Sequence, residues 1–287
     1  MPVDIDKLMR FRVPDARQAL SARDIAFYSL SIGVGQDALD ASHLEYVDPL
    51  RGPKVMPAMV LVMAHPGFYL SDPESGVDPK MVLHSEQAIE ILGRVPGEGL
   101  VESRTRITDV IDKGPGKAAL IMAETELFHS DRAFARLNRT TFIREGGGFG
   151  GSPLSSQPVP VNQVPDTAPD ALVDMETRPD QALLYRLNGD YNPLHSDPEL
   201  ARRAGFERPI LHGLCTMGIV CNAILRNVGY SRVEALRSVR LRFSKPVYPG
   251  ETIRTEIWND GSFRARVPSR DITVIDGGLA VFDHTGI

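Results

Sequence analysis

Cysteine, excess positive charge and long apolar runs are all scarce in this 287-residue sequence. Its two cysteines, Cys215 and Cys221, lie six residues apart in one predicted helix and cannot form a disulfide there. No Cys-x-x-Cys pair or histidine cluster is present, so we predict no metal site. We expect both cysteines to be small core residues in a protein of the reducing cytoplasm.

The charge and the apolar runs exclude further classes of protein. The formal net charge is -5, which argues against a surface for nucleic acid or anionic membranes. The most apolar run, residues 55–64, is shorter than the ~18 residues of a membrane span and contains Pro57. The first residues lack the basic and apolar regions of a secretion signal. We therefore expect a soluble globular protein with no membrane or nucleic-acid partner.

Nucleotide-binding motifs are missing as well. The glycine-rich run at residues 146–151 lacks the Gly-Lys-Ser/Thr ending of a phosphate loop and opens no predicted helix. No Rossmann fingerprint occurs elsewhere, which disfavours an NAD-dependent oxidoreductase.

The most informative stretch is residues 185–195, Tyr-Arg-Leu-Asn-Gly-Asp-Tyr-Asn-Pro-Leu-His. Gly189 and Pro193 interrupt any helix, so Asp190 and His195 lie on one irregular segment. A carboxylate and an imidazole on such a segment can converge on one water molecule and transfer protons in both directions. Taken alone, the same residues are also typical of a turn cap and a polar loop residue.

A second motif, Arg-Pro-Ile-Leu-His-Gly-Leu at residues 208–214, leads into an apolar predicted helix. Gly213 would lie at the start of that helix, where free backbone N–H groups and the helix dipole favour negative charge. The oxygen of a thioester enolate is such a charge. A plain capping glycine is the alternative interpretation.

Together with Phe-Ser-Lys-Pro-Val-Tyr-Pro-Gly at residues 243–250, these motifs resemble the MaoC-like or hydratase 2 family of (R)-specific enoyl-CoA hydratases. The resemblance implies a double hotdog fold of the α+β class, in which each repeat wraps an antiparallel sheet around a long helix. It implies reversible hydration of trans-2-enoyl-CoA to (R)-3-hydroxyacyl-CoA, in fatty-acid or steroid side-chain β-oxidation. Asp190 and His195 would be the catalytic pair, and Gly213 the oxyanion donor.

The resemblance also implies which residues meet the acyl-CoA thioester, the expected partner. These substrate-binding positions are His84, Ser85, Lys113, Tyr191, Asn192, Pro193, Leu194 and Phe243. Ser85 departs from the family pattern, where glycine is common. We expect Asn192 mainly to fix its loop; outside the family context, Lys113 would be a solvated turn residue and Phe243 sheet core. No cofactor is expected, because CoA is part of the substrate, and a homodimer is compatible with the family.

The chain divides into a degenerate hotdog at residues 1–151, a Pro- and Ser-rich linker at 152–168 and a catalytic hotdog at 169–287. Aligning Gly33 with Gly189 places Val34 opposite Asp190 and Leu39 opposite His195. We expect these two apolar residues to be buried or to line the acyl pocket. A second similarity aligns residues 82–85 with 210–213.

Hydrophobic periodicity predicts the elements of both halves. Helices are predicted at residues 15–31, 85–95, 178–187, 197–204 and 212–227, with 85–95 as the central helix of the first half. Strands are predicted at residues 100–111, 118–127, 238–244, 253–258, 263–267 and 272–282, the last bent near Gly277.

Two alternative functions remain open at this point. Hotdog proteins also hydrolyse thioesters, usually with a carboxylate on the central helix, and Glu86 and Glu90 on the predicted first-half helix would suit that role. A non-catalytic acyl-CoA-binding subunit is the other alternative. The presence of Asp190, His195 and Gly213 together argues against it.

Overall fold

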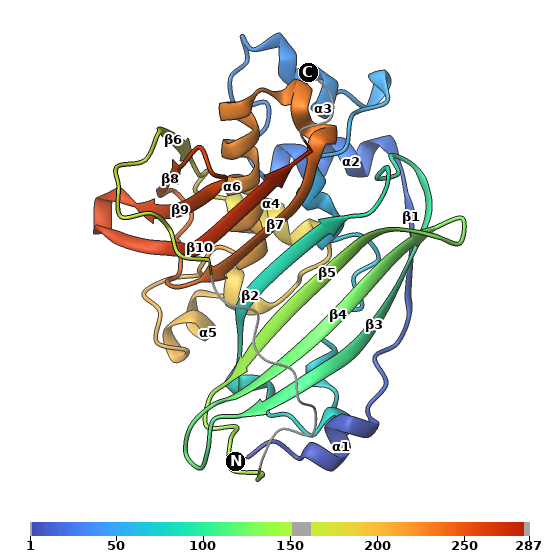
Figure 1. The fold of residues 1–287 in the computed structure, drawn as a ribbon, viewed down its shortest axis with the longest axis vertical. Helices are drawn as coiled ribbons and strands as arrows, with labels where there is room; N and C mark the ends of the chain where they lie inside the picture. Colours follow the sequence, from blue (N-terminus) through green and yellow to red (C-terminus); the bar gives the residue numbers. More distant parts are fainter. Residues whose placement is uncertain (1, 151–161, 284–287) are drawn as a thin grey trace.

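The computed structural model describes residues 2–150 and 162–283, and its dominant feature is one antiparallel sheet (Figure 1). Within these residues ten strands are hydrogen-bonded in the order β1, β3, β4, β5, β2, β7, β10, β9, β8, β6. The strands are β1 (Ala16–Leu20), β2 (Val82–Ile91), β3 (Gly99–Asp112), β4 (Ala119–His129), β5 (Arg132–Ile143), β6 (Ala171–Glu176), β7 (Leu236–Phe243), β8 (Thr252–Ile257), β9 (Ser262–Val267) and β10 (Ile272–Phe282).

The strand order shows an internal repeat. Read from its outer edge inward, the first half runs β1, β3, β4, β5, β2 and the second half runs β6, β8, β9, β10, β7. The halves meet where β2 pairs antiparallel with β7, and there Ile89 lies opposite Val239, both buried. The predicted pair of repeats is thus present in one sheet. Of the predicted linker, residues 152–161 lie outside the described part of the chain.

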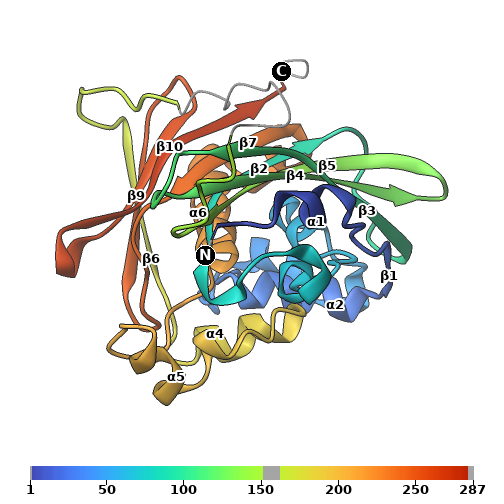
Figure 2. The same ribbon diagram turned by 90° about the horizontal axis from the view of Figure 1, so that it is seen from below.

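The helices gather on one side of this sheet (Figure 2). They are α1 (Ile5–Arg10), α2 (Ala22–Ser31), α3 (Leu44–Val47), α4 (Gln181–Tyr185), α5 (Pro198–Arg203) and α6 (Gly213–Val228). α6 is the central helix of the second half and is buried all round its circumference between Cys215 and Leu225, as expected for a helix that is apolar on every face. No helix in the described ranges is long and apolar enough to cross a membrane.

A glycine lets α2 of the first half approach α6 of the second. A Cβ atom at Gly218 would come within 2.6 Å of the Ile32 side chain and 3.0 Å of the Tyr28 hydroxyl. Asn222 of α6 also donates a hydrogen bond to the Ile32 carbonyl at 3.2 Å. Contacts of this kind join the two repeats into one core.

The predicted central helix of the first half is wrong, because residues 85–91 belong to strand β2. Gln87 and Ile89 are buried, while Glu86 and Glu90 make ion pairs with arginines of β7 and β5. This alternation has the period of a strand. The place of the helix is taken by the buried segment Met56 to Ala64, which contains a short 3₁₀-helix, Pro57–Leu61. Pro66 and Gly67 prevent its extension.

Three other expectations for the first half need correction. Residues 16–20 are the edge strand β1 rather than the start of a helix, and α2 begins at a capping box of Ser21 and Asp24. β5, missing from the prediction, follows β4 through a tight turn with positive φ at Ser130 and Asp131. The similarity of residues 82–85 to 210–213 is also wrong, because β2 occupies the place of β7.

The other predicted elements are confirmed. β3, β4 and β7 to β10 lie where the alternation placed them, and β10 shifts register between Asp276 and Leu279. The expected helices of the second half are α4 with a 3₁₀ turn at Arg186–Asn188, α5 and α6. Cys215 and Cys221 are buried, free thiols.

Candidate active site

The segment that carries Asp190 and His195 is held by hydrogen bonds between its own side chains and main chain. Gly189 has a φ of 112°, a conformation open to glycine, and this turns the chain out of the helical region before Asp190. Asp190 Oδ1 accepts the N–H of Asn192 at 3.2 Å, and Asn192 Oδ1 accepts the N–H of Leu194 at 3.0 Å. The side chain of Asn192 therefore fixes the loop, as predicted, and starts the 3₁₀ turn Pro193–His195.

His195 is buried and its orientation determines which nitrogen can act. Its Nδ1 lies 2.8 Å from the carbonyl oxygen of Ile210. Because a carbonyl can only accept, we place the proton of the neutral ring on Nδ1, which leaves the Nε2 lone pair open. Burial lowers the pKa of His195 below its usual value, and the hydrogen bond to Ile210 partly opposes this. The neutral ring is thus favoured near pH 7, as a base requires.

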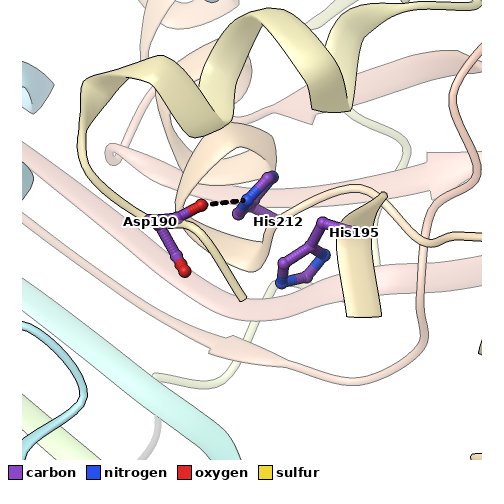
Figure 3. A group of neighbouring side chains, drawn as sticks. All are labelled: Asp190, His195 and His212. Carbon is purple, nitrogen blue, oxygen red and sulfur yellow. Dashed lines mark hydrogen bonds between the residues drawn. The ribbon is translucent and has the colours of Figure 1, made fainter. Parts of the chain in front are cut away.

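A second histidine, His212, contacts both members of the pair (Figure 3). Its ring stacks on His195 with 3.7 Å between centroids and 27° between planes, and its Nε2 lies 3.2 Å from the main-chain oxygen of Asp190. Burial also lowers the pKa of His212. The sequence analysis did not include His212 as a site residue, although its place beside Gly213 could have suggested it.

Asp190, His195 and His212 each offer an atom within 4.8 Å of the others, which raises the question of a metal. Imidazole lone pairs lie in the ring planes, so those of two stacked, nearly parallel rings run side by side rather than converge. Nδ1 of His195 and Nε2 of His212 are in addition occupied by carbonyl oxygens. The geometry therefore suits proton transfer and not a metal centre.

Gly213 is the first residue of α6, and no hydrogen bond from its N–H to a described residue is present. The ring of Phe243 lies beside it, 3.4 Å from where a Cβ would be. His84 also contacts Phe243, edge on, with ring centroids 4.9 Å apart. Three predicted residues are therefore linked by contacts next to the free N–H of Gly213: Gly213 of α6, Phe243 of β7 and His84 of β2.

The remaining predicted substrate residues are less closely connected. Tyr191 is exposed, Pro193 is exposed and Leu194 is half-buried on the loop between Asp190 and His195. Ser85 lies at a register shift in β2, next to His84. Lys113 is exposed in the turn between β3 and β4. The contacts given by the described residues do not link Ser85 or Lys113 to the catalytic pair, and their roles stay predictions.

The first half contributes two polar residues that the sequence analysis missed, His65 and Arg139. His65 is accessible, yet desolvation lowers its pKa to about 4, with the charge of Arg139 acting in the same direction and that of Asp190 opposing. Arg139 also helps to lower the pKa of His84, after burial as the main cause. Both residues thus lie near the predicted site. The sequence alone did not show which face of β5 carries Arg139, because β5 and its strand partners were not predicted.

The first-half equivalents of the catalytic residues carry no proton chemistry. Val34 is buried, as expected, but Leu39 is 94% exposed and does not line a pocket, which corrects that prediction. A cavity of about 1140 Å³ lies beside Pro57, Ile91 and Leu236. These residues mark the start of the buried 3₁₀-helix, the end of β2 and the start of β7. They mirror the positions of Gly213, Phe243 and His84, so the cavity lies at the first-half equivalent of the region around Gly213.

The carboxylates proposed for thioester hydrolysis are placed elsewhere. Glu86 pairs with Arg242 at 3.3 Å and Glu90 with Arg136 at 3.2 Å, both on the outer face of the sheet. Neither lies on a helix. The structural basis for the thioesterase alternative is therefore absent from the described residues.

Comparisons with known proteins place this site in a class. Residues 160–275 match the MaoC-like domain, and residues 19–145 match the MFE-2 hydratase 2 N-terminal domain. A solved MaoC-like dehydratase from Phytophthora capsici superposes with a TM-score of 0.85 at 32% identity, covering 99% of this chain and 100% of that one. The architecture is the double hotdog of MaoC-like dehydratases.

Curated relatives narrow the class to a family. The peroxisomal enoyl-CoA hydratase 2 of Arabidopsis thaliana is 39% identical over 95% of this chain and 93% of its own length. An enoyl-CoA hydratase of Mycobacterium tuberculosis is 38% identical over 97% and 98%. The chain belongs to the MaoC-like, hydratase 2 family.

Proposed function

We propose that the protein catalyses the reversible addition of water to trans-2-enoyl-CoA, giving (R)-3-hydroxyacyl-CoA. The observation that carries this proposal is the joint placement of three groups. A ring nitrogen of His195 and a carboxylate oxygen of Asp190 lie within 4.8 Å of each other, and the free N–H of Gly213 begins the neighbouring helix. Relatives named enoyl-CoA hydratase support the same reaction.

In the hydration direction, the thioester carbonyl conjugated with the double bond makes carbon 3 electrophilic. Asp190 and Nε2 of His195 hold the attacking water, and His195 accepts its proton as the oxygen bonds to carbon 3. The electrons of the double bond move to the thioester oxygen, where the Gly213 N–H and the dipole of α6 stabilise the charge. The pair then returns one proton to carbon 2, so one water is consumed and the enzyme is restored.

The reaction as proposed needs no cofactor, because no electrons are gained or lost overall. His212 keeps the two reacting groups in register through its hydrogen bond to Asp190 and its stack on His195. Phe243 and His84 form the wall beside the thioester. Chain length and pathway are separate matters from this chemistry.

Adding the purified protein to crotonyl-CoA and to a longer enoyl-CoA, and following both enoyl absorbance and free thiol, tests the proposal. We expect loss of absorbance without thiol release. A coupled (S)-specific 3-hydroxyacyl-CoA dehydrogenase should form no NADH while enoyl-CoA is consumed. Thiol release would indicate a thioesterase, and strong NADH formation would refute the (R) assignment.

Two further proposals concern where and how the protein works. We propose that the protein is located in the cytoplasm. Because the Arabidopsis relative is named peroxisomal, fractionation of the source cells would test this location. A homodimer stays a proposal, which light scattering at several concentrations would test.

A further inference from the structure

Arg139 lies on the buried face of the sheet. Along β5 the side chains of Leu137, Thr141 and Ile143 are buried, and Arg139 follows the same alternation. Its partners in register, Gln87 on β2 and Ala123 on β4, are buried too. The side chain therefore leaves the sheet on its core-facing side, where it is half-buried.

In this position Arg139 has no hydrogen bond or ion pair with any described residue, and its Nε is buried without a partner. Arg136, on the outer face of the same strand, is by contrast neutralised by ion pairs with glutamates of β2 and β4. An unpaired cation among buried side chains is costly, and such a group calls for a specific reason. A ligand that supplies the missing anion is such a reason.

The titratable side chains on which the charge of Arg139 acts are two histidines and a tyrosine, not carboxylates. His65, Tyr69 and His84 all lie close enough for its charge to act on them. Nδ1 of His65 accepts the N–H of Gly67 at 3.0 Å, so its ring proton lies on Nε2, where it can be donated. The amide of Gln87 is used by two main-chain carbonyls.

The same cluster is continuous with the catalytic pair. His65 feels the charge of Asp190 as well as that of Arg139. His84 touches Phe243, which lies beside the Gly213 amide. A substrate held at Asp190 and Gly213 would therefore reach Arg139 with another part of the same molecule.

We propose that Arg139 binds an oxyanion of the thioester substrate and so selects substrates that carry one. Guanidinium forms paired, charge-assisted hydrogen bonds with carboxylate or phosphate oxygens. In an acyl-CoA the oxyanion is either a carboxylate on the acyl chain or a phosphate of the CoA portion. The proposal rests on the proposed hydratase function, because it extends the same site.

Kinetics on matched substrates separate the two sources. One pair of trans-2-enoyl-CoAs differs only in a terminal carboxylate and is taken at several chain lengths; the other pair is crotonyl-CoA and crotonyl-pantetheine. Each is measured with wild type, Arg139→Met and Arg139→Lys. Arg132→Met, an exposed arginine at the start of the same strand, serves as the control. Thermal unfolding shows whether each variant is folded.

For Arg139→Met we expect kcat/KM to fall about ten- to a hundredfold for substrates with the recognised oxyanion, the scale of a charged hydrogen bond. The partner lacking it should change less than about twofold. Loss on the carboxylated member of its pair alone assigns the acyl chain, and equal loss on every CoA substrate but not on crotonyl-pantetheine assigns a phosphate. Equal losses on all substrates, or no loss on any, would overturn the proposal.

A binding measurement keeps this test apart from the proposed function. Saturated acyl-CoAs with and without a terminal carboxylate, and the matching acyl-pantetheine, are titrated into wild type and Arg139→Met by calorimetry. Tighter binding of the recognised member, lost in Arg139→Met, supports the oxyanion site even if no substrate is hydrated. If enoyl-CoA is hydrated while Arg139→Met binds every ligand like wild type, only the oxyanion site fails.

Discussion

The two halves of the sheet have the same strand order but differ in what covers them. In the second half the sixteen residues of α6 begin at Gly213, whereas the first half places a five-residue 3₁₀-helix that begins at Pro57. The residue before each start has nearly the same backbone, with φ -59° and ψ 136° at His212 and φ -68° and ψ 126° at Met56. The backbone that leads into the two helix starts is thus similar, while the residues at the starts differ.

The comparison shows which features the fold needs and which only catalysis needs. Burial of a strand face depends on apolar alternation, and both halves keep it. Proton transfer and oxyanion binding depend on single groups, and in the first half Val34 stands for Asp190, Met56 for His212 and Pro57 for Gly213. Proline has no N–H, so even a correctly placed chain offers no oxyanion donor there.

The largest effect on turnover is expected from removing the acid–base groups of the second half, which the first half lacks. Asp190→Asn and His195→Ala should each lower turnover by ~10²–10⁴, the usual loss on removing general acid–base catalysis. The double variant should be little slower than either single one, because the groups act on the same water. Hydration rates close to wild type in either variant would remove the pair from the mechanism.

Gly213→Pro should come next, because it copies Pro57 and deletes the amide hydrogen while keeping the helix start. Proline is accepted at the first position of a helix, and the backbone of His212 is already extended as a following proline demands. We expect a loss of ~10²–10³ in kcat, as for one oxyanion donor. Gly213→Ala retains the N–H and should lose far less; equal losses would point to crowding against Phe243 instead.

His212→Met, which copies Met56, should lower kcat by about tenfold, since one hydrogen bond and one ring contact are lost. The variant also tests pH dependence. Burial lowers the pKa of His195 and His212, so between the unfolded value near 6.5 and the folded values the unfolded chain binds more protons. The free energy of unfolding should therefore fall as the pH drops below about 6.5. Denaturant titrations across this range should show a shallower fall in His212→Met; an identical slope would contradict the assignment.

The smallest effect is expected at Leu39, the exposed equivalent of His195. Leu39→Ala should change the free energy of unfolding by less than about 0.5 kcal/mol and leave chain-length preference unaltered. Val34→Asp, at the buried equivalent of Asp190, should by contrast cost several kcal/mol because it buries a carboxylate without a partner. A change in chain-length preference on Leu39→Ala would restore a pocket role for this residue.

Much of the second half could be predicted from its sequence because its signals are local. Asp190 and His195 lie five residues apart on one segment that Gly189 and Pro193 keep irregular. Gly213 directly precedes a long apolar stretch. Strands β7 to β10 show an alternation of apolar and polar residues that is visible in the sequence alone. The family resemblance rests on these same motifs.

The first half was harder because its decisive contacts are between distant segments. Residues 85–91 have apolar spacing that suits a short helix, and only pairing with β5 and β7 turns Gln87 and Ile89 inward. The apolar character of Leu39 suggested burial, yet the fold leaves it in solvent. Local patterns cannot distinguish these outcomes.

The sequence by itself determined the proposed acid, base and oxyanion glycine and predicted the two-repeat plan, because each of these depends on residue type within a short segment. Only the tertiary structure decided that His212 stacks on His195 and lies within hydrogen-bond distance of the main chain of Asp190, and that Arg139 is half-buried without a partner among the described residues. The reason is physical: burial, loss of a partner and the resulting pKa shifts are properties of the neighbours that strand pairing brings together. The residue type of a histidine or an arginine does not indicate which neighbours it will have in the fold.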